Sequence, residues 1–259
     1  MACVIVIVCA NAFAQQRSIP LDQLRSGSSY MSPDHRAMQA DDFSNPGMLW
    51  VAKGEKLWNT PAGSKTADGK PQACASCHTG AKTSMKGAAT RYPAFDRNAK
   101  KLLNLDGRIN QCRTGRQGAP AFAPESDEAL SISAYVAHQS RGLPLNASIA
   151  PEAQANFERG QALYQRRIGQ MNLACLHCHE WNAGQRLLAE SISQGHPNAY
   201  PVYRLEWQST GSLHRRLRAC YFGVRAEMPP YGSPDLLDLE LFLVWRAQGL
   251  AVETPGVRR

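Results

Sequence analysis

The sequence predicts a mainly α-helical protein made of two similar units, which are related by internal duplication and connected by long loops. Three observations predict this architecture. The chain has 259 residues, which suits two compact units of roughly 100 to 120 residues better than one. Four sequence patterns in the first half return in the second half, as expected for a duplication. Serine, proline and glycine residues stand where helices commonly begin and end.

Residues 1–14 are expected to form a secretory signal peptide. They are an apolar run that closes with Ala12-Phe13-Ala14, the small-x-small pattern at which such peptides are cut. The mature chain is therefore predicted to begin near Gln15 and to reside in the periplasm. An N-terminal strand or anchor is the alternative, but a membrane span is excluded because about a dozen apolar residues are too few. No other segment of the sequence is apolar enough to be transmembrane. Residues 15–45 form an N-terminal extension, rich in polar and turn residues, that is expected to wrap over the surface.

The duplicated unit is defined by patterns that recur 101 to 108 residues apart. The pairs are Gly54-Glu-Lys-Leu-Trp58 with Gly160-Gln-Ala-Leu-Tyr164, Ala73–His78 with Ala174–His179, Arg108-Ile-Asn-Gln-Cys112 with Arg216-Leu-Arg-Ala-Cys220, and Gly142-Leu143 with Gly249-Leu250. These positions place the first unit at residues 46–142 and the second at residues 157–259. Residues 143–156 between them are polar and rich in proline and alanine, which is typical of a linker.

Each unit is predicted to close with a helix. Ser126 and Ser233 are suitable N-caps, and Pro234 stands at the first helical position, where proline is favoured. Gly142 and Gly249 can adopt the left-handed conformation that commonly ends a helix. Apolar residues of the second helix recur at helical spacing and are expected to form its buried face. These residues are Leu237, Leu241, Val244 and Trp245.

The charge of the chain limits the classes of partner. Its formal net charge is +8, and residues 1–14 contribute none of it. A basic protein favours anionic small molecules or acidic protein partners and accelerates their encounter. Nucleic acid is set aside as a partner because of the expected export and the motifs described next.

Two CxxCH motifs predict the cofactor. Removal of residues 1–14 would leave six of the eight cysteines, and four of those six belong to these motifs. In CxxCH the two thiols bond the vinyl groups of a haem and the histidine reaches the iron as proximal ligand. The motifs are Cys74, Cys77 and His78 in the first unit and Cys175, Cys178 and His179 in the second. They predict two covalently bound haem c groups in two cytochrome c-like haem domains. A zinc site shared by both motifs is the alternative, and it would leave both histidines unexplained.

The distal ligand of each iron is expected to be a cysteine. Met85 and Met228 are the methionine alternatives for the first and second haem. Cysteine, however, is the only unpaired ligand type that is duplicated at matching positions, at Cys112 and Cys220, each four residues after an arginine. This repetition favours thiolate ligation. A disulfide between the two cysteines and a plain buried thiol at each position stay open.

Arginines surround Cys220 in the sequence, and they would favour its thiolate form and attract anions. They are Arg215, Arg216, Arg218 and Arg225. Arg216 precedes Cys220 by about one helical turn, so that both side chains would lie on one face of a helix. For some of these arginines a solvated basic face is the alternative.

These features together resemble the SoxA family, the dihaem subunits of the SoxAX cytochromes of sulfur-oxidising bacteria. The similarity covers nearly all of the chain after residue 14. Besides both CxxCH motifs it includes Gln39–Asp42, Asn45–Gly47, Gly54-Glu55, Leu57-Trp58, Asn110–Arg113, Arg216–Cys220, Arg225–Glu227, Tyr231–Ser233, Trp245-Arg246, Gly249-Leu250 and Glu253–Arg258. Met228 departs from the family, in which proline is expected, and this keeps a His/Met pair open for the second haem.

The resemblance implies an enzyme that couples thiosulfate oxidatively to a cysteine of the carrier SoxYZ and passes electrons through haem to a downstream cytochrome c. It implies an active site in the second unit, where Cys220 ligates the iron opposite His179 and handles the substrate sulfur, and where Arg216 binds the anion. Cys112 would ligate the first iron opposite His78. A SoxX cytochrome c subunit would complete a heterodimer.

Three alternatives stay open. Arg216 could hold a haem propionate instead of the substrate. The protein could be a dihaem thiosulfate dehydrogenase that forms tetrathionate, or a plain dihaem electron-transfer cytochrome.

Overall fold

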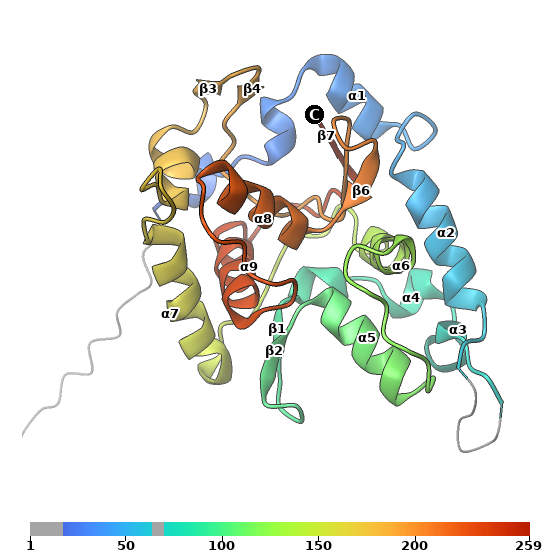
Figure 1. The fold of residues 1–259 in the computed structure, drawn as a ribbon. Helices are drawn as coiled ribbons and strands as arrows, with labels where there is room; N and C mark the ends of the chain where they lie inside the picture. The colour runs from blue at the N-terminus through green and yellow to red at the C-terminus, as the bar shows by residue number, and fades with distance from the viewer. Residues whose placement is uncertain (1–17, 64–69) are drawn as a thin grey trace, which may run out of the picture.

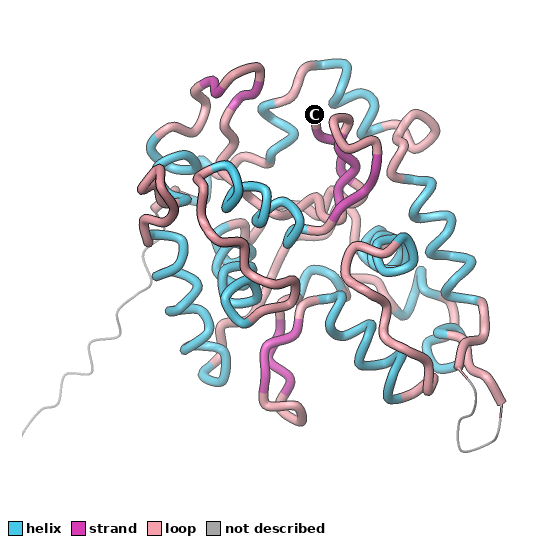
Figure 2. The backbone as a smooth tube through the Cα atoms, in the orientation of Figure 1, coloured by secondary structure: helices cyan, strands magenta, loops and turns pink. Residues whose placement is uncertain are grey.

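The computed structural model describes residues 18–63 and 70–259. It confirms a mainly helical fold, as Figure 1 and Figure 2 show. The predicted signal peptide, residues 1–14, lies outside the described residues. Within the described part of the chain, no helix is both long and apolar enough to cross a membrane.

The two halves of the chain contain similar series of elements. The first contains α1 (Pro33–Ala40), α2 (Met48–Asn59), α3 (Cys74–His78), α4 (Ala81–Ser84), β1 (Ala94–Asp96), β2 (Lys101–Leu103), α5 (Leu105–Gly115) and α6 (Asp127–His138), with 3-10 turns at Leu21–Gln23, Gly27–Tyr30 and Ala89–Arg91. The second contains α7 (Pro151–Gln165), a π-helical turn (His177–Trp181), β3 (Arg186–Leu187), β4 (Glu190–Ser191), β5 (Val202–Arg204), β6 (Ser209–Gly211), α8 (Leu213–Gly223), α9 (Pro234–Arg246) and β7 (Gly256–Arg258). In each half, a CxxCH motif precedes a hairpin and a helix that carries one of the two remaining cysteines, Cys112 on α5 and Cys220 on α8.

Each half is built on a pair of closely packed helices, α2 with α6 and α7 with α9. Glycine stands at each point of closest approach. A Cβ atom on Gly54 would lie 2.1 Å from the carbonyl oxygen of Ser131, and one on Gly160 would lie 2.0 Å from that of Asp238. No larger residue fits at either position. The glycines therefore allow the two helix backbones of each pair to approach this closely.

The closing helices begin where the sequence predicts, but α6 ends at His138 and α9 at Arg246, four and three positions before Gly142 and Gly249. The side chains of Ser126 and Ser233 accept hydrogen bonds from backbone N–H groups three residues later, and Pro234 occupies the first turn of α9. Gly142 and Gly249, which follow α6 and α9, have φ values of +82° and +97°. The N-caps are confirmed because each depends on local chemistry that the sequence states directly. The left-handed glycines lie in the turn that follows each helix and do not cap it.

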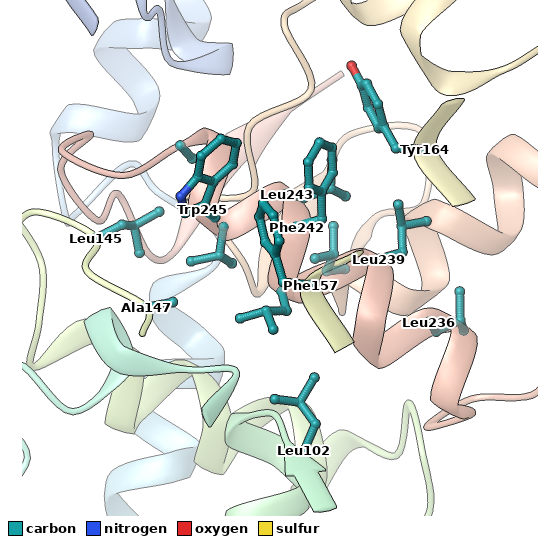
Figure 3. Close-up of a cluster of buried hydrophobic side chains, with 14 of the residues drawn as sticks. Leu102, Leu145, Ala147, Phe157, Tyr164, Leu236, Leu239, Phe242, Leu243 and Trp245 are labelled. Atoms are coloured by element: carbon teal, nitrogen blue, oxygen red, sulfur yellow. The ribbon is translucent and has the colours of Figure 1, made fainter. Parts of the chain in front are cut away.

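The larger buried core surrounds α9 (Figure 3). The Phe157 ring of α7 contacts the rings of Phe242 and Trp245, at centroid distances of 5.6 and 4.9 Å. Of the four predicted core positions in α9, three are buried, and Leu237 is partly buried against the same cluster. The second CxxCH motif and α8 pack against this core through Cys175, Leu213 and Leu217.

A small sheet leads into α8. Its strand order is β6-β5-β7, with β5 antiparallel to β6 and parallel to β7. The β5–β6 hairpin runs directly into α8, whose N-cap, Ser212, accepts a hydrogen bond from the backbone N–H of Arg215. The sheet therefore fixes the start of the helix that carries Cys220.

The N-terminal extension packs against the second half of the chain. The backbone N–H of Arg25 donates to Oε1 of Gln194 at 2.7 Å. The amide oxygen of Gln39 accepts from the backbone N–H of Val257 at 3.0 Å, which ties α1 to β7. In Figure 1, α1 lies beside β7 and the C-terminus.

The segment between the halves is shorter than expected. Helix α7 begins at Pro151, so that residues 151–156 of the predicted linker form its first turns. Pro151 is well suited to the first helical position, and Ala153 is buried in the core. Proline and alanine, which suggested a linker, here start a helix.

Candidate functional site

The second CxxCH motif presents His179 in a fixed orientation. Cys178 and His179 lie on the π-helical turn, and Cys175 stands just before it. Nδ1–H of His179 donates to the carbonyl oxygen of Ser193 at 2.8 Å. Because a carbonyl oxygen can only accept, this bond leaves Nε2 as the nitrogen that is free to bind a metal. Gly195 packs against the same ring, and a Cβ atom there would lie 2.8 Å from Cγ of His179.

The thiol of Cys220 faces His179 from α8. Burial alone would raise the pKa of this thiol, but a hydrogen bond with His179 and the positive charges of Arg216 and Arg204 lower it to about 7. The thiol also lies within electrostatic range of Cys175, whose pKa rises to about 12 chiefly through burial. A nitrogen and a sulfur that face each other beside the CxxCH thiols would suit a haem c with His/Cys ligation.

The first motif forms the whole of α3. Cys77 is exposed, whereas Cys74 is partly buried and accepts a hydrogen bond from Gln117 at 3.6 Å. Burial is the main cause that raises the pKa of Cys74, and the charge of Cys112 adds to it. The ring of His78 lies 5.8 Å from that of Trp58. Within the described residues, no hydrogen bond joins His78 to Cys112, in contrast to the second site.

Of the four arginines near Cys220 in the sequence, the structure places Arg216 at the thiol. Burial lowers the pKa of Arg216, but the negative charges of Cys220, Tyr200, Glu206 and Glu190 together outweigh burial, and the pKa is raised. Arg215 stacks on Trp207, with its guanidinium carbon 4.1 Å from the ring centroid.

The other arginines point elsewhere. Arg218 stacks on Tyr231 at 4.5 Å, and Arg225 is exposed in the turn after α8. Sequence reasoning missed Arg204, a buried residue at the end of β5 that also acts on the Cys220 thiol.

The structure does not gather the two CxxCH motifs into one metal site. Across residues 18–63 and 70–259, no cluster of three His, Cys, Asp or Glu side chains could hold a metal ion. A haem needs only two protein ligands on its iron, so His179 and Cys220 would be sufficient.

Cys112 and Cys220 are both free thiols. Met85 packs against the core of the first half, and Met228 is 42% exposed.

Two halves that each combine a crossing helix pair with a CxxCH motif define the class of c-type cytochromes. A family model described as SoxA/TsdA, cytochrome c domain, matches residues 53–145. The chain is 41% identical to the L-cysteine S-thiosulfotransferase subunit SoxA of Pseudaminobacter salicylatoxidans, covering 93% of this chain and 82% of that protein. It is 36% identical to the SoxA of Rhodovulum sulfidophilum, covering 92% and 81%.

Among solved structures, the chain superposes on SoxXA from P. pantotrophus with a TM-score of 0.85 and 34% sequence identity, covering 91% of this chain and 87% of that one. The chain belongs to the SoxA family.

Replacement of Gly195 by alanine is expected to disturb the second haem alone, because the new methyl group would meet the ring of His179. The expected cost is about 1 to 3 kcal/mol of stability, together with a changed absorption spectrum of one haem. Gly184→Ala is the matched control, since Gly184 has a similar φ of +91° and nothing within 4 Å of its Cβ position. Spectra and thermal melting of the two purified variants check this. Equal effects of both substitutions would show that the backbone conformation matters and the contact with His179 does not.

Proposed function

We propose that this chain is the dihaem subunit of a periplasmic thiosulfate-oxidising complex, and that it joins thiosulfate to a cysteine of the SoxYZ carrier. As a SoxA protein, it is a cytochrome c-type subunit of an L-cysteine S-thiosulfotransferase. The observation that supports this best is the environment of Cys220, a thiol between His179 and a positively charged arginine pair. A plain electron carrier has no use for an anion-attracting thiol at its iron.

The reaction joins two sulfur atoms and releases two electrons. The carrier thiol RSH and thiosulfate S₂O₃²⁻ give RS–S–SO₃⁻, one proton and two electrons; the S–H bond breaks and an S–S bond forms. Haem, when bound, accepts the electrons and passes them on to a downstream cytochrome c. Arg216 holds the sulfonate end of thiosulfate, because a guanidinium offers a planar fork to oxyanion oxygens. Cys220 presents a polarisable sulfur beside it and handles the outer sulfur of the substrate.

Two haem c groups are expected. The first would be attached to Cys74 and Cys77, with His78 and Cys112 on its iron, and would serve structure or accessory electron transfer. The second would be attached to Cys175 and Cys178, with His179 and Cys220 on its iron. A SoxX subunit would be the partner, as the name of the similar SoxXA structure from P. pantotrophus supports, and it would contribute a further haem.

Mass spectrometry of protein matured in a bacterial periplasm checks the cofactor and the export. We expect a chain that begins near Gln15 and carries the mass of two haems. One haem or none, in cells with an active cytochrome maturation system, would contradict the assignment.

The enzymatic proposal is tested with the purified complex of this chain and SoxX, supplied with thiosulfate, reduced SoxYZ and an oxidised cytochrome c. We expect the carrier to gain the mass of one thiosulfate unit while the cytochrome is reduced by two electrons per transfer. Tetrathionate formed without the carrier would instead identify a thiosulfate dehydrogenase. Cytochrome reduction by other donors with neither product would identify an electron carrier.

A further inference from the structure

Helices α5 and α8, which carry Cys112 and Cys220, each follow a hairpin, and the two hairpins have the same register. Strand β1 pairs with β2 so that Asp96 lies opposite Lys101, and β5 pairs with β6 so that Arg204 lies opposite Ser209. In both hairpins this pair is the last before the turn. Each hairpin then leads into a helix that is capped by a side chain, α5 by Asn104 and α8 by Ser212. Residues 96 and 204 therefore occupy equivalent places in the two hairpins, and they are 108 positions apart in the sequence.

In the first half, Asp96 neutralises the arginine that precedes the ligand cysteine. Nη2 of Arg108 lies 2.9 Å from Oδ2 of Asp96, and the Asp96 side chain is 5% exposed. Two further N–H groups of Arg108 donate to the hydroxyl of Tyr92, at 3.2 Å, and to the amide oxygen of Gln111. Gln111 in turn donates to Asp96 at 3.2 Å. The guanidinium of Arg108 thus has its charge balanced by Asp96, and each of its three nitrogens has a partner.

In the second half, the equivalent position carries the opposite charge. Arg204 stands where the first half has Asp96, and Arg216 stands where it has Arg108. Among the described residues, no carboxylate forms an ion pair with Arg216. Arg204 itself is 6% exposed, and its Nε contacts Glu206 at 3.2 Å, a residue whose side chain is 50% exposed. Its guanidinium also lies over the ring of Trp207, at 5.2 Å.

The shared register sets Arg204 beside Arg216 as it sets Asp96 beside Arg108, whose side chains lie 2.9 Å apart. Burial lowers the pKa of Arg204, and the charge of Arg216 lowers it further. Two positive charges held close together at a buried site repel each other. A doubly charged anion relieves that repulsion and offers oxygens to both forks. Tyr200, which takes the place of Tyr92, lies within electrostatic range of both arginines.

We propose that Arg204 is the second anion-binding residue of the Cys220 site, and that arginine at the position of Asp96 makes this half selective for a doubly charged sulfur oxyanion. The inference rests on the proposed function and names the residue that sets its substrate class. It also accounts for the difference between the halves: the same hairpin and helix form a charge-balanced site at Cys112 and an anion site at Cys220.

The test measures thiosulfate binding and turnover in the holo complex with SoxX. Arg204→Gln is expected to raise the KM for thiosulfate about 10- to 100-fold with kcat changed less than about threefold, because it removes one charged donor. Arg204→Asp, which copies the first half, is expected to abolish measurable binding. Arg204→Lys should restore part of the affinity, since it keeps the charge but loses the fork. Asp96→Asn, at the equivalent place in the first half, should leave KM and kcat unchanged.

Calorimetric titration of each variant with thiosulfate separates binding from turnover, and absorption spectra report on the haems. Unchanged affinity in Arg204→Gln or Arg204→Asp would overturn the inference. A lost or shifted second haem in Arg204→Lys or Arg204→Gln would overturn it as well, since it would assign Arg204 to a haem propionate. If the unmodified complex bound thiosulfate but did not transfer it to SoxYZ, the proposed function would fail while the role of Arg204 in binding could still be measured.

Discussion

Replacement of Cys220 by alanine is expected to abolish thiosulfate transfer, lowering turnover by at least about three orders of magnitude. The substitution removes the sulfur that faces His179 and stands beside Arg216. It is also expected to change the spectrum of the second haem only, because the proposed thiolate ligand would be lost from one iron. Electron paramagnetic resonance of the oxidised protein and the carrier-transfer assay check the two effects.

Cys112→Ala is the matched control, at the equivalent position of α5. It should change only the other haem signal and leave most of the transfer activity, because Cys112 lies beside the charge-balanced pair of Arg108 and Asp96. If Met228→Ala altered the second haem signal while Cys220→Ala left it intact, the distal ligand would be methionine and the assignment would be wrong.

Replacement of Arg216 is expected to have the next largest effect. Arg216→Ala should lower kcat/KM by about two to three orders of magnitude, by analogy with the loss of one donor from an oxyanion site. Arg216→Lys should restore only part of it, because an ammonium group does not reproduce the planar fork. Both variants should keep two haems, near-native spectra and intact binding to SoxX. Turnover and haem content of the purified complexes measure this.

Arg108→Ala tests whether the effect belongs to the second half. Although it breaks the ion pair with Asp96, it should leave thiosulfate transfer nearly unchanged. Full activity of Arg216→Ala would refute the substrate role, and a lost or shifted second haem in that variant would identify Arg216 as a propionate ligand.

The parts of the fold and site that the sequence predicted depend on local chemistry. The caps at Ser126 and Ser233 join atoms three residues apart, so the residue type and its place before an apolar stretch are sufficient. The CxxCH motifs could be recognised for the same reason, because the five residues of each motif are consecutive in the sequence. The proximity of Cys220 to His179 is not local, and it was predicted from a repeated pattern instead of a periodicity.

The parts that were missed depend on contacts between distant segments. Strands of three residues, such as β1 and β5, are too short for a period of two to stand out. The role proposed for Arg204 depends on the register of the β5–β6 hairpin. The sequence alone does not show which residue Arg204 pairs with. Ser193 contributes a backbone carbonyl oxygen, which any residue type could supply. The start of α7 was misjudged because proline and alanine suit both a linker and a first helical turn.

The bond between Gln39 and Val257 spans 218 positions of the chain, and this has a consequence for the order of folding. Synthesis proceeds from the N-terminus, so α1 emerges long before β7, the strand on which it docks. Closing so long a loop is slow compared with forming the local helix pairs. The halves can therefore fold around their own cores first, and β7 then adds to β5, which carries Arg204. Helix α1, the first of the described α-helices to be synthesised, therefore reaches its final position last.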